Sequence, residues 1–289
     1  MDGLELAAVW RGRLKKAASV IRQKTGRRPH LHVIMVGDHP PSQLYVQRKR
    51  EAAEAVEIDF ALHAFPEDIG QDRLLKHVKQ LNADPACDGM IVQLPLPQNL
   101  DTSTILEAVE PQKDLDGLHP YNRGCLYDSG RSPFFIPCTP WGCLQLLQAN
   151  KVDLMGLHVL IIGRSCLVGR PFAAVCLRKN ATVTIAHSHT KNLPQLVRTA
   201  DVVCVAVGRP AFFKGAWLKK GAVVLDVGIH KVAGIVCGDV DRNSALENAS
   251  YISPVPGGIG PMTVTGLLYN CLKASFHHAG LLFPLEDDV

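Results

Sequence analysis

A glycine-rich turn in the second half of the chain has the residue types and spacing that bind a phosphate group. The apolar run Val159 to Ile162 ends at Gly163, and Gly169 and Pro171 follow in the spacing G-x-S-x-x-x-G-x-P. A buried strand that leads through such a turn into a helix presents backbone N–H groups and a helix N-terminus to a pyrophosphate. The pattern predicts dinucleotide binding, and the alternative is an ordinary tight turn between a strand and a helix.

The end of the next predicted strand, Thr182 to Ala186, indicates which dinucleotide binds. NAD sites usually place Asp or Glu there to hold the ribose 2′-hydroxyl. Here the strand is followed by His-Ser-His-Thr, without an acid. The Arg164 guanidinium and the Ser188 hydroxyl suit a 2′-phosphate instead, so we expect NADP rather than NAD. A solvated loop arginine is the alternative for Arg164, and the two histidines of this loop are interpreted as surface residues.

Four polar side chains in the first half of the chain could act on a substrate. Tyr45 and Lys49 are four residues apart in a predicted helix and share one of its faces. Gln93 lies near the end of a predicted strand, and Asp116 precedes a segment rich in Gly and Pro. Polar groups at the carboxyl ends of parallel strands line the crevice where α/β proteins bind ligands. These residues could converge there, although a surface lysine is the simpler interpretation of Lys49 taken alone.

Strands and helices alternate along the chain and must position these residues. Apolar periodicity predicts helices over 4–23, 43–56, 71–82, 139–150, 171–179, 193–199 and 262–279. Short apolar runs predict strands or extended segments over 31–36, 57–64, 89–94, 158–162, 182–186, 201–207, 223–227 and 251–253. Ser42 follows two prolines and is predicted to cap the second helix. The alternation predicts βαβ units with mostly parallel sheets.

A Gly- and Pro-rich segment over residues 117–140 is the best candidate for a domain junction. It divides the chain into a first domain, 1–137 plus the returning helix 262–289, and a second domain, 138–261. We expect the glycine-rich loop Pro256 to Pro261 to be a mobile lid.

Composition limits the class of protein. The chain has 289 residues, 47% hydrophobic and 20% charged, which is typical of globular domains and too apolar for a disordered chain. The formal net charge of +4 comes from scattered basic residues, so we expect no nucleic-acid partner. No apolar run reaches the roughly 20 residues that cross a bilayer, and the N-terminus lacks a signal or transit pattern. We therefore expect a cytoplasmic protein that does not interact with membranes.

The cysteines predict no metal site. Their number, nine, is odd, and no C-x-x-C motif occurs. Cys138 and Cys143 are five residues apart, but no second pair completes a zinc site. We expect reduced cysteines that pack as small apolar residues.

Seven segments together resemble the methylenetetrahydrofolate dehydrogenase/cyclohydrolase family. They are Val36 to Asp38, Ser42 to Lys49, Asp88 to Pro97, Pro111 to Gly117, Pro137 to Gly142, Gly163 to Ser165 and Pro254 to Thr263. The third, fourth and last read DGMIVQLPLP, PQKDLDG and PVPGGIGPMT. The segments occur in the family's order and span nearly the whole chain. We therefore expect a member of this family.

The resemblance implies a bifunctional folate enzyme with an α/β fold in two domains. One is an α/β folate-binding catalytic domain, and the other is a Rossmann-type parallel-sheet domain that binds NADP, with a cleft between them. The first reaction oxidises 5,10-methylene-tetrahydrofolate to 5,10-methenyl-tetrahydrofolate with NADP. The second hydrolyses that product to 10-formyl-tetrahydrofolate. A homodimer is also implied, as is a place in one-carbon metabolism and purine biosynthesis.

The resemblance also assigns roles to individual residues. Lys49 corresponds to the catalytic lysine, Tyr45 to the tyrosine one turn before it, Gln93 to the glutamine that tunes the lysine, and Asp116 to the aspartate that holds the pterin ring. The implied cofactor-binding residues are Gly163, Arg164, Ser165, Gly169, Pro171, Ser188 and Ile229. The implied substrate-binding residues are Tyr45, Lys49, Gln93, Leu94, Pro95, Asp116, Gly257, Gly258 and Pro261. His230 departs from the family, where Asn is usual, near the expected nicotinamide end.

Three other functions stay open at this point. A two-domain dehydrogenase resembling shikimate dehydrogenase shares the layout, but it recognises its substrate with a different lysine/aspartate pair. An NAD-specific, monofunctional methylenetetrahydrofolate dehydrogenase would need something other than Arg164 and Ser188 at the adenosine ribose. A non-catalytic dinucleotide-sensing module would show no turnover, and the intact set of polar residues in the first half disfavours it.

Overall fold

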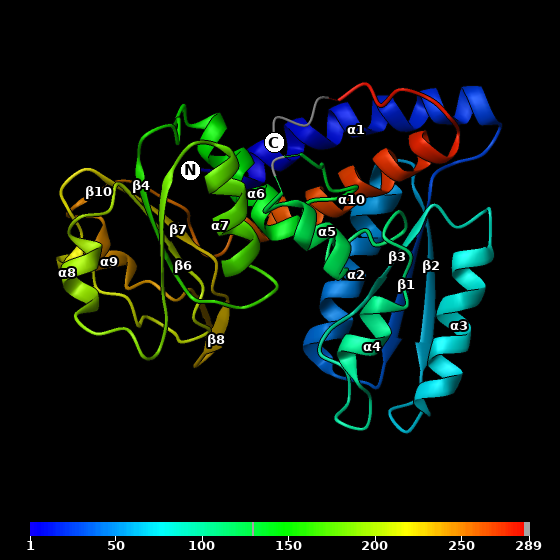
Figure 1. Ribbon diagram of the computed structural model, residues 1–289, viewed down its shortest axis with the longest axis horizontal. Coiled ribbons are helices and arrows are strands. Elements are labelled where there is room, and N and C mark those ends of the chain that lie inside the picture. The colour runs from blue at the N-terminus through cyan, green and yellow to red at the C-terminus, as the bar shows by residue number, and fades with distance from the viewer. Residues whose placement is uncertain (129, 286–289) are drawn as a thin grey trace. The chain divides into compact units, whose positions relative to one another are not determined.

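The computed structural model describes residues 1–128 and 130–285, and most of its elements are labelled in Figure 1. The chain divides into two units. Of the described residues, the three-stranded unit comprises Val9 to Cys138 and Val264 to Leu285, and the five-stranded unit comprises Met1 to Ala8 and Thr139 to Thr263. The divisions fall inside helices α1 (Gly3–Thr25) and α10 (Ile259–His278) and after the first residue of α6 (Cys138–Ala149), so each of these helices contributes residues to both units.

The three-stranded unit contains a parallel sheet in the order β2-β1-β3. Its strands are β1 (His30–Val36), β2 (Asp59–Phe65) and β3 (Gly89–Val92). Its remaining helices are α2 (Pro40–Ala55), α3 (Gln71–Ala83), α4 (Thr102–Glu107) and α5 (Pro120–Cys125). The buried face of α3 consists of Leu74, Val78 and Leu81, whose spacing places them on one side of a helix. This face and α4 pack against alternate side chains of β1 and β3 to form one core.

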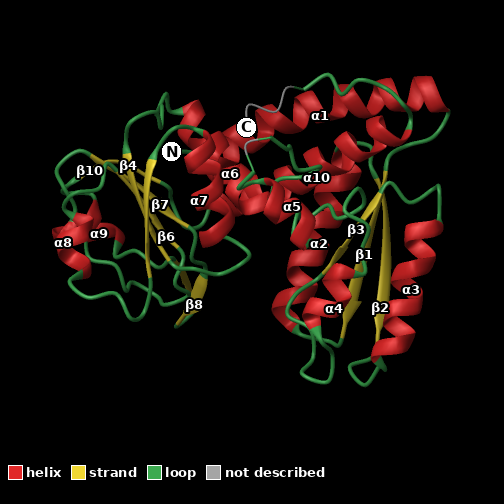
Figure 2. Ribbon diagram, in the orientation of Figure 1, coloured by secondary structure: helices red, strands yellow, loops and turns green. Residues whose placement is uncertain are grey.

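The five-stranded unit contains a parallel sheet in the order β10-β7-β6-β4-β5. Its strands are β4 (His158–Ile162), β5 (Thr182–Ala186), β6 (Val202–Val205), β7 (Ala222–Asp226) and β10 (Ala249–Ile252), drawn yellow in Figure 2. The helical segments are α6 (Cys138–Ala149), α7 (Gly169–Arg178), α8 (Leu193–Val197), η1 (Gly215–Trp217) and α9 (Arg242–Ala245). An antiparallel hairpin joins β8 (His230–Val232) to β9 (Ile235–Cys237).

The strand order explains where this unit can bind a ligand. The strand that follows β4 in the chain, β5, lies on one side of β4, and β6 lies on the other. The order therefore reverses between β4 and β6, and ligands of open α/β sheets bind outside the carboxyl ends of the strands at such a point. Strands β6 and β7 are fully buried, as expected for a parallel sheet covered on both faces. The predicted α/β fold with parallel sheets in two domains is confirmed.

Two local predictions were wrong. Ser42 does not cap α2, because the helix already begins at Pro40, with His39 as its N-cap and Ser42 buried inside. Proline is favoured in the first turn of a helix, where its fixed φ is already helical, so the two prolines start the helix rather than precede it. The proposed lid is also shorter than expected, because α10 begins at Ile259 and the last three residues of the predicted loop are helical.

The membrane prediction was tested on the helices. Within residues 1–128 and 130–285, no helix is both long enough and apolar enough to cross a bilayer.

Candidate functional site

The predicted lysine and glutamine meet in the three-stranded unit. Lys49 lies in the last two turns of α2, and Gln93 follows directly after β3. The Lys49 Nζ donates a hydrogen bond to the Gln93 Oε1 over 3.0 Å. The Gln93 Nε2 in turn donates to the Leu94 carbonyl over 2.9 Å, which fixes the amide with its oxygen toward the amine. Both side chains are partly buried, so the amine is oriented and still accessible.

The Gln93 backbone is also held in place. Its N–H donates to the Ile34 carbonyl of the neighbouring strand β1 over 2.8 Å. The pair therefore stands at the carboxyl end of a parallel sheet, the edge at which α/β proteins bind ligands. Tyr45, one turn before Lys49 on the same helix, is partly buried. Leu94 and Pro95, two further residues of the predicted substrate set, follow Gln93 directly in the chain.

Asp116 has a partner that the sequence did not predict. The Cys138 thiol lies 3.7 Å from the Asp116 Oδ1 and 3.3 Å from the Leu115 carbonyl. Complete burial, with the Asp116 carboxylate nearby, raises the pKa of Cys138 well above its usual value, whereas the positive charge of Lys49 lowers it. Cys138 therefore stays a neutral thiol, which can donate a hydrogen bond to Asp116.

Cys138 was expected to be only a packed cysteine. Its thiol instead contacts Asp116, and the charges of both Asp116 and Lys49 act on it. Asn270 of α10 also contacts the thiol, with its Nδ2 3.7 Å from the Cys138 Sγ and 2.8 Å from the Leu115 carbonyl. The only available sequence signal was the position of Cys138 within a segment that resembles the family.

The glycine-rich turn of the five-stranded unit has the predicted form. It joins β4 to α7, and Gly163 adopts a φ of +128°, which favours glycine. A Cβ at Gly163 would overlap the Ala206 carbonyl oxygen, and one at Gly169 would overlap the Gly163 carbonyl oxygen. The Val168 N–H donates to the Ser165 hydroxyl over 3.2 Å. The turn therefore packs tightly at the point where the strand order reverses, and only glycine fits at its two ends.

Arg164 and the loop after β5 lie close together. The Gly163 N–H donates to the Ala186 carbonyl over 2.9 Å, which joins the two turns. Desolvation and then the positive charge of Arg164 lower the pKa of His187, with a smaller contribution from the neighbouring His189 ring. Arg164 and Ser188 are both exposed, so both can reach a ligand. The histidines of this loop contact each other, since the His189 N–H lies 3.2 Å from the His187 Nδ1.

The remaining predicted site residues of this unit lie after β7 and around the start of α10. Ile229, between β7 and β8, is 44% exposed. The Gly257 carbonyl accepts hydrogen bonds from the Gly3 and Leu4 N–H groups over 2.9 Å and 3.1 Å. A Cβ at Gly3 would overlap the carbonyl of the buried Gly258. The first residues of α1 therefore hold the loop that was predicted to be a lid, and Pro261 belongs to the first turn of α10.

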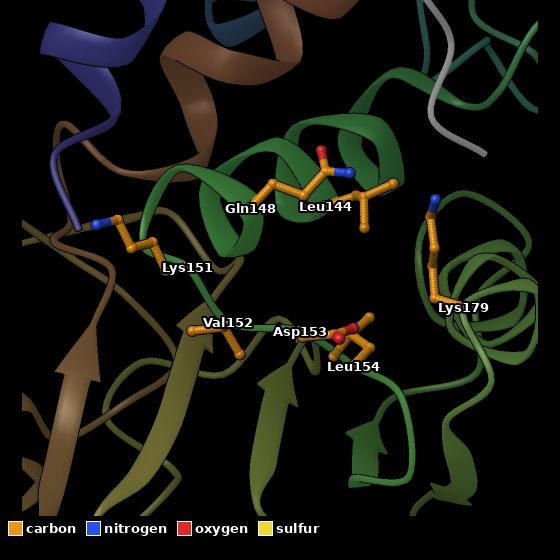
Figure 3. Close-up of a pocket in the computed structure, with 7 residues that line it drawn as sticks. All are labelled: Leu144, Gln148, Lys151, Val152, Asp153, Leu154 and Lys179. Atoms are coloured by element: carbon orange, nitrogen blue, oxygen red, sulfur yellow. The ribbon is translucent and has the colours of Figure 1, made fainter.

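A cavity of about 300 Å³ in the five-stranded unit does not coincide with this site. Figure 3 shows its lining residues from α6, the segment before β4 and the end of α7. They are Leu144, Gln148, Lys151, Val152, Asp153, Leu154 and Lys179. Because the cavity borders the segment that enters β4, it lies toward the amino ends of the strands, away from the edge where dinucleotides bind.

Within residues 1–128 and 130–285, no group of three or more His, Cys, Asp or Glu residues is arranged to hold a metal ion. All nine cysteines are free.

Two family models match the chain. The model described as the catalytic domain of tetrahydrofolate dehydrogenase/cyclohydrolase matches residues 1–116. The model described as its NAD(P)-binding domain matches residues 137–279.

Curated relatives and solved structures agree with this match. The bifunctional protein FolD of Geotalea uraniireducens is 46% identical over 276 residues, which cover 95% of this chain and 98% of the relative. The crystal structure of the bifunctional FolD enzyme of Campylobacter jejuni has a TM-score of 0.92 and 41% identity, over 96% of this chain and 98% of that one. The Trypanosoma brucei enzyme, solved with NADP and an inhibitor, has a TM-score of 0.91 and 37% identity, over 96% and 97% of the two chains.

Structures related to two of the alternatives are more distant. A yeast NAD-dependent methylenetetrahydrofolate dehydrogenase has a TM-score of 0.80 at 20% identity, and the Aquifex aeolicus shikimate dehydrogenase has 0.52 at 16%. Such low identities show a shared fold alone. From the two family models and the identity to full-length relatives, the chain belongs to the tetrahydrofolate dehydrogenase/cyclohydrolase family.

Proposed function

We propose that the protein oxidises 5,10-methylene-tetrahydrofolate to 5,10-methenyl-tetrahydrofolate with NADP and then hydrolyses the product to 10-formyl-tetrahydrofolate. The observation that carries this proposal is the hydrogen bond from the Lys49 Nζ to the Gln93 Oε1. It places an oriented amine at the carboxyl end of the catalytic domain's sheet. The FolD relatives, which are named as bifunctional, support both activities.

Lys49 is the proton carrier of the hydrolytic step. The substrate is a cation, which disfavours an ammonium group beside it, so Lys49 acts as the neutral amine. A water molecule adds to the amidinium carbon and gives a proton to the Lys49 Nζ. Lys49 then passes that proton to the ring nitrogen as the carbon–nitrogen bond breaks, and the hydroxyl of the adduct releases its own proton to solvent as the formyl C=O forms.

The residues around Lys49 orient the amine and the folate. Gln93 cannot change its charge, so it directs the lone pair of the amine without competing for the proton. Tyr45 supplies a ring for stacking and a hydroxyl for orientation. Asp116 binds the polar edge of the pterin ring, and Cys138 restricts the Asp116 carboxylate through the thiol contact of 3.7 Å. Leu94 and Pro95 form the adjoining wall of the folate site.

The five-stranded unit binds NADP. The fit of this unit to NADP rests on two glycine positions, Gly163 and Gly169, where a Cβ would overlap a backbone carbonyl oxygen. Arg164 and Ser188 bind the 2′-phosphate, while Ser165 and Pro171 shape the turn and Ile229 contacts the cofactor farther along. When bound, the nicotinamide accepts the hydride, a transfer that needs positioning rather than an acid or base. The relative from Trypanosoma brucei, solved with NADP, supports this choice.

The same proposal includes the bounds of the two domains, the oligomeric state and the cellular location of the protein. Residues 1–137 and 262–289 form the folate-binding domain, and 138–261 form the NADP-binding domain. Gly257, Gly258 and Pro261 contribute to folate binding. We also infer a cytoplasmic homodimer that serves one-carbon metabolism and purine biosynthesis and binds no nucleic acid. Light scattering of the purified protein tests the dimer, because a monomeric mass would contradict it.

Absorbance assays of the purified protein test the two activities separately. We expect methenyl-tetrahydrofolate to form from methylene-tetrahydrofolate with NADP, and added methenyl-tetrahydrofolate to disappear faster than without protein. Turnover with NAD only would contradict the assignment of Arg164 and Ser188. The absence of both reactions would favour a non-catalytic dinucleotide-binding protein.

A further inference from the structure

The five-stranded unit contains a buried carboxylate with an unusual set of hydrogen-bond donors. Asp239 follows β9 and is fully buried. Its carboxylate accepts hydrogen bonds from three successive backbone N–H groups, those of Val207, Gly208 and Arg209, over 2.7, 3.0 and 2.8 Å. Successive N–H groups that point to one spot form a concave anion site, and here a side chain of the protein itself fills that site.

The same carboxylate has a fourth donor. The His230 Nε2, at the start of β8, lies 2.7 Å from the Asp239 Oδ1. The His230 side chain is 20% exposed, whereas that of Asp239 is fully buried. His230 thus donates to the same carboxylate oxygen that accepts the Arg209 N–H.

The position of Asp239 is itself fixed by a second buried carboxylate. Asp226, the last residue of β7, accepts hydrogen bonds from the Asp239 and Val240 N–H groups over 2.9 and 3.1 Å. The Asp226 N–H donates to the Ser253 hydroxyl over 2.8 Å. The network therefore joins the ends of β6, β7 and β10 to the β8–β9 hairpin.

The segment that Asp239 holds, residues 206–209, lies beside the glycine-rich turn. The Ala206 N–H donates to the Ile162 carbonyl over 2.8 Å. The Ala206 carbonyl oxygen occupies the space where a Cβ of Gly163 would stand. The held segment is therefore one wall of the crevice where the strand order reverses.

The strand order also tells which half of a dinucleotide this wall faces. In this fold the pyrophosphate lies at the turn after the first strand, and the 2′ position of the adenosine ribose lies at the end of the next strand along the chain. Those strands are β4 and β5. The other half of the dinucleotide must then extend toward β6 and β7, where Asp239 holds the backbone.

We propose that Asp239 and His230 are positioning residues that hold segment 206–209 in the shape required by the nicotinamide half of NADP. Neither residue touches the reacting atoms. The inference rests on the proposed NADP binding, and it adds that affinity for the nicotinamide half depends on the hydrogen bond from His230 to Asp239.

The test uses the full-length protein and two ligands, NADP and adenosine 2′,5′-bisphosphate, which lacks the nicotinamide half. The His230→Leu variant removes the donor, and His230→Gln restores a donor of similar reach. Lys231→Leu is the matched control, because it places the same side chain at the exposed neighbouring position of β8. Calorimetry measures both affinities, and hydrogen exchange measures the protection of the amides of residues 207–209.

We expect His230→Leu to weaken NADP binding about tenfold, the value of one hydrogen bond to a charged group. Its affinity for adenosine 2′,5′-bisphosphate should be unchanged, and the three amides should exchange faster. His230→Gln should recover NADP affinity, and Lys231→Leu should match the wild type.

If His230→Leu bound NADP with wild-type affinity, or lost affinity for both ligands equally, the inference would be overturned and the proposed function would stand. Failure of the wild-type protein to bind NADP would overturn the proposed function, and the inference with it.

Discussion

Lys49 and Gln93 are 44 residues apart in the chain, yet the Lys49 Nζ and the Gln93 Oε1 are joined by a hydrogen bond of 3.0 Å. One residue comes from α2 and the other from the end of β3. The contact makes Gln93 the group that orients the amine, and the Gln93 amide is itself fixed by the Leu94 carbonyl. The pair thus provides two separate tests of the hydrolytic step.

Replacing Lys49 by Met should abolish hydrolysis of methenyl-tetrahydrofolate, with a loss of about 100-fold or more, because the proton acceptor for water is removed. NADP binding should be unchanged, since the cofactor site belongs to the five-stranded unit. The hydrolysis rate and the NADP affinity are measured on the same preparation. Lys76→Met, at an exposed position of α3, is the control. If NADP binding were lost together with hydrolysis, the assignment of Lys49 to the hydrolytic step alone would be refuted.

Replacing Gln93 by Glu should slow hydrolysis about tenfold at neutral pH and move the pH profile of the rate to higher pH. A carboxylate at this position would stabilise the ammonium form of Lys49, which cannot accept a proton from water. The pH dependence of hydrolysis between pH ~6 and ~9 measures the effect. Gln98→Glu, an exposed position in the following loop, should keep the wild-type profile. An unshifted profile in Gln93→Glu would mean that Gln93 does not tune the amine.

Replacing Arg164 by Ala should weaken NADP binding about tenfold and leave NAD binding unchanged. A guanidinium contributes a charge-assisted hydrogen bond to a 2′-phosphate, and NAD carries a hydroxyl there instead. The ratio of KM for NADP to KM for NAD in the dehydrogenase assay measures the change. Arg198→Ala, an exposed arginine just after α8, serves as the control. An equal loss for both dinucleotides would assign Arg164 to the pyrophosphate instead.

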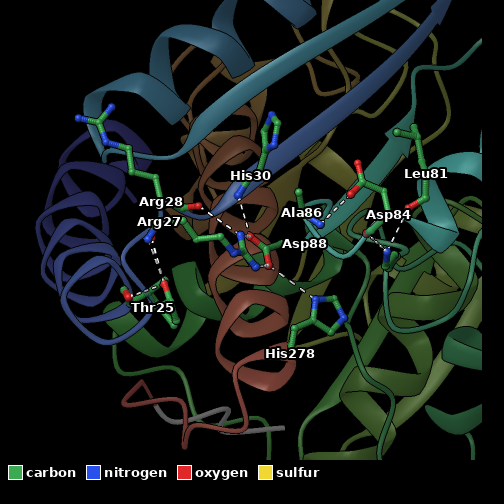
Figure 4. Close-up of polar contacts among 11 residues, drawn as sticks. Thr25, Arg27, Arg28, His30, Leu81, Asp84, Ala86, Asp88 and His278 are labelled. Carbon is green, nitrogen blue, oxygen red and sulfur yellow. Dashed lines mark hydrogen bonds and ion pairs between the residues drawn. The ribbon is translucent and has the colours of Figure 1, made fainter.

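Replacing Asp88 by Asn should lower the free energy of unfolding by about 3 kcal/mol, because the change leaves a partly buried guanidinium without its partner. The fully buried Asp88 carboxylate is bound by Arg27 through two hydrogen bonds of 2.7 Å, by the His30 N–H and by His278 of α10 (Figure 4). Urea unfolding at neutral pH measures the loss. Asp59→Asn, whose exposed ion pair with Arg28 spans 3.5 Å, should cost far less.

The Asp88 carboxylate also makes the free energy of unfolding depend on pH. Burial opposes its charged form, but the hydrogen bonds from Arg27 and the 3.6 Å contact with His278 prevail and lower the pKa of Asp88 below 3.8. The stability that Asp88 contributes is therefore complete above the ordinary carboxyl pKa and is lost as the pH falls through the lowered value. The difference between the wild type and Asp88→Asn should shrink in strong acid, and a constant difference would contradict the ion pair.

A row of histidines between the β1–β2 edge of the sheet and α3 should make the three-stranded unit sensitive to mild acid. The His32 Nδ1 lies 2.9 Å from the His63 Nε2, and the ring of His77 lies 4.6 Å from that of His63. Burial lowers the pKa of all three, that of His32 to about 4. As the pH falls, the unfolded chain therefore binds protons at these histidines before the folded protein does. Their contribution to the free energy of unfolding is complete above pH 6.5 and is lost from there toward pH 4.

Replacing His32 by Gln should reduce this pH dependence by up to about 3 kcal/mol between neutral pH and pH ~4. Urea unfolding at a series of pH values measures the slope, and His189→Gln, in an exposed loop, should leave it unchanged. An identical slope in the wild type and His32→Gln would show that other groups carry the dependence.

Much of the fold could be predicted because its signals are local. The apolar run before Gly163 and the helix pattern after Gly169 predicted the strand, the turn and α7, since buried parallel strands and amphipathic helices differ in their hydrophobic period. Boundaries were less predictable. Proline is compatible with both the position before a helix and its first turn, so the pattern around Ser42 did not tell where α2 begins.

The sequence by itself determined the family, the parallel α/β class and the residue types that the two reactions require, because motifs and periodicity survive in the order of residues along the chain. Only the tertiary structure decided which of these side chains meet. It paired Lys49 with Gln93, placed the Cys138 thiol on Asp116, and filled the backbone nest of residues 207–209 with Asp239. Such contacts join residues that are 22 to 44 positions apart. They depend on strand order and on burial, which no local pattern encodes.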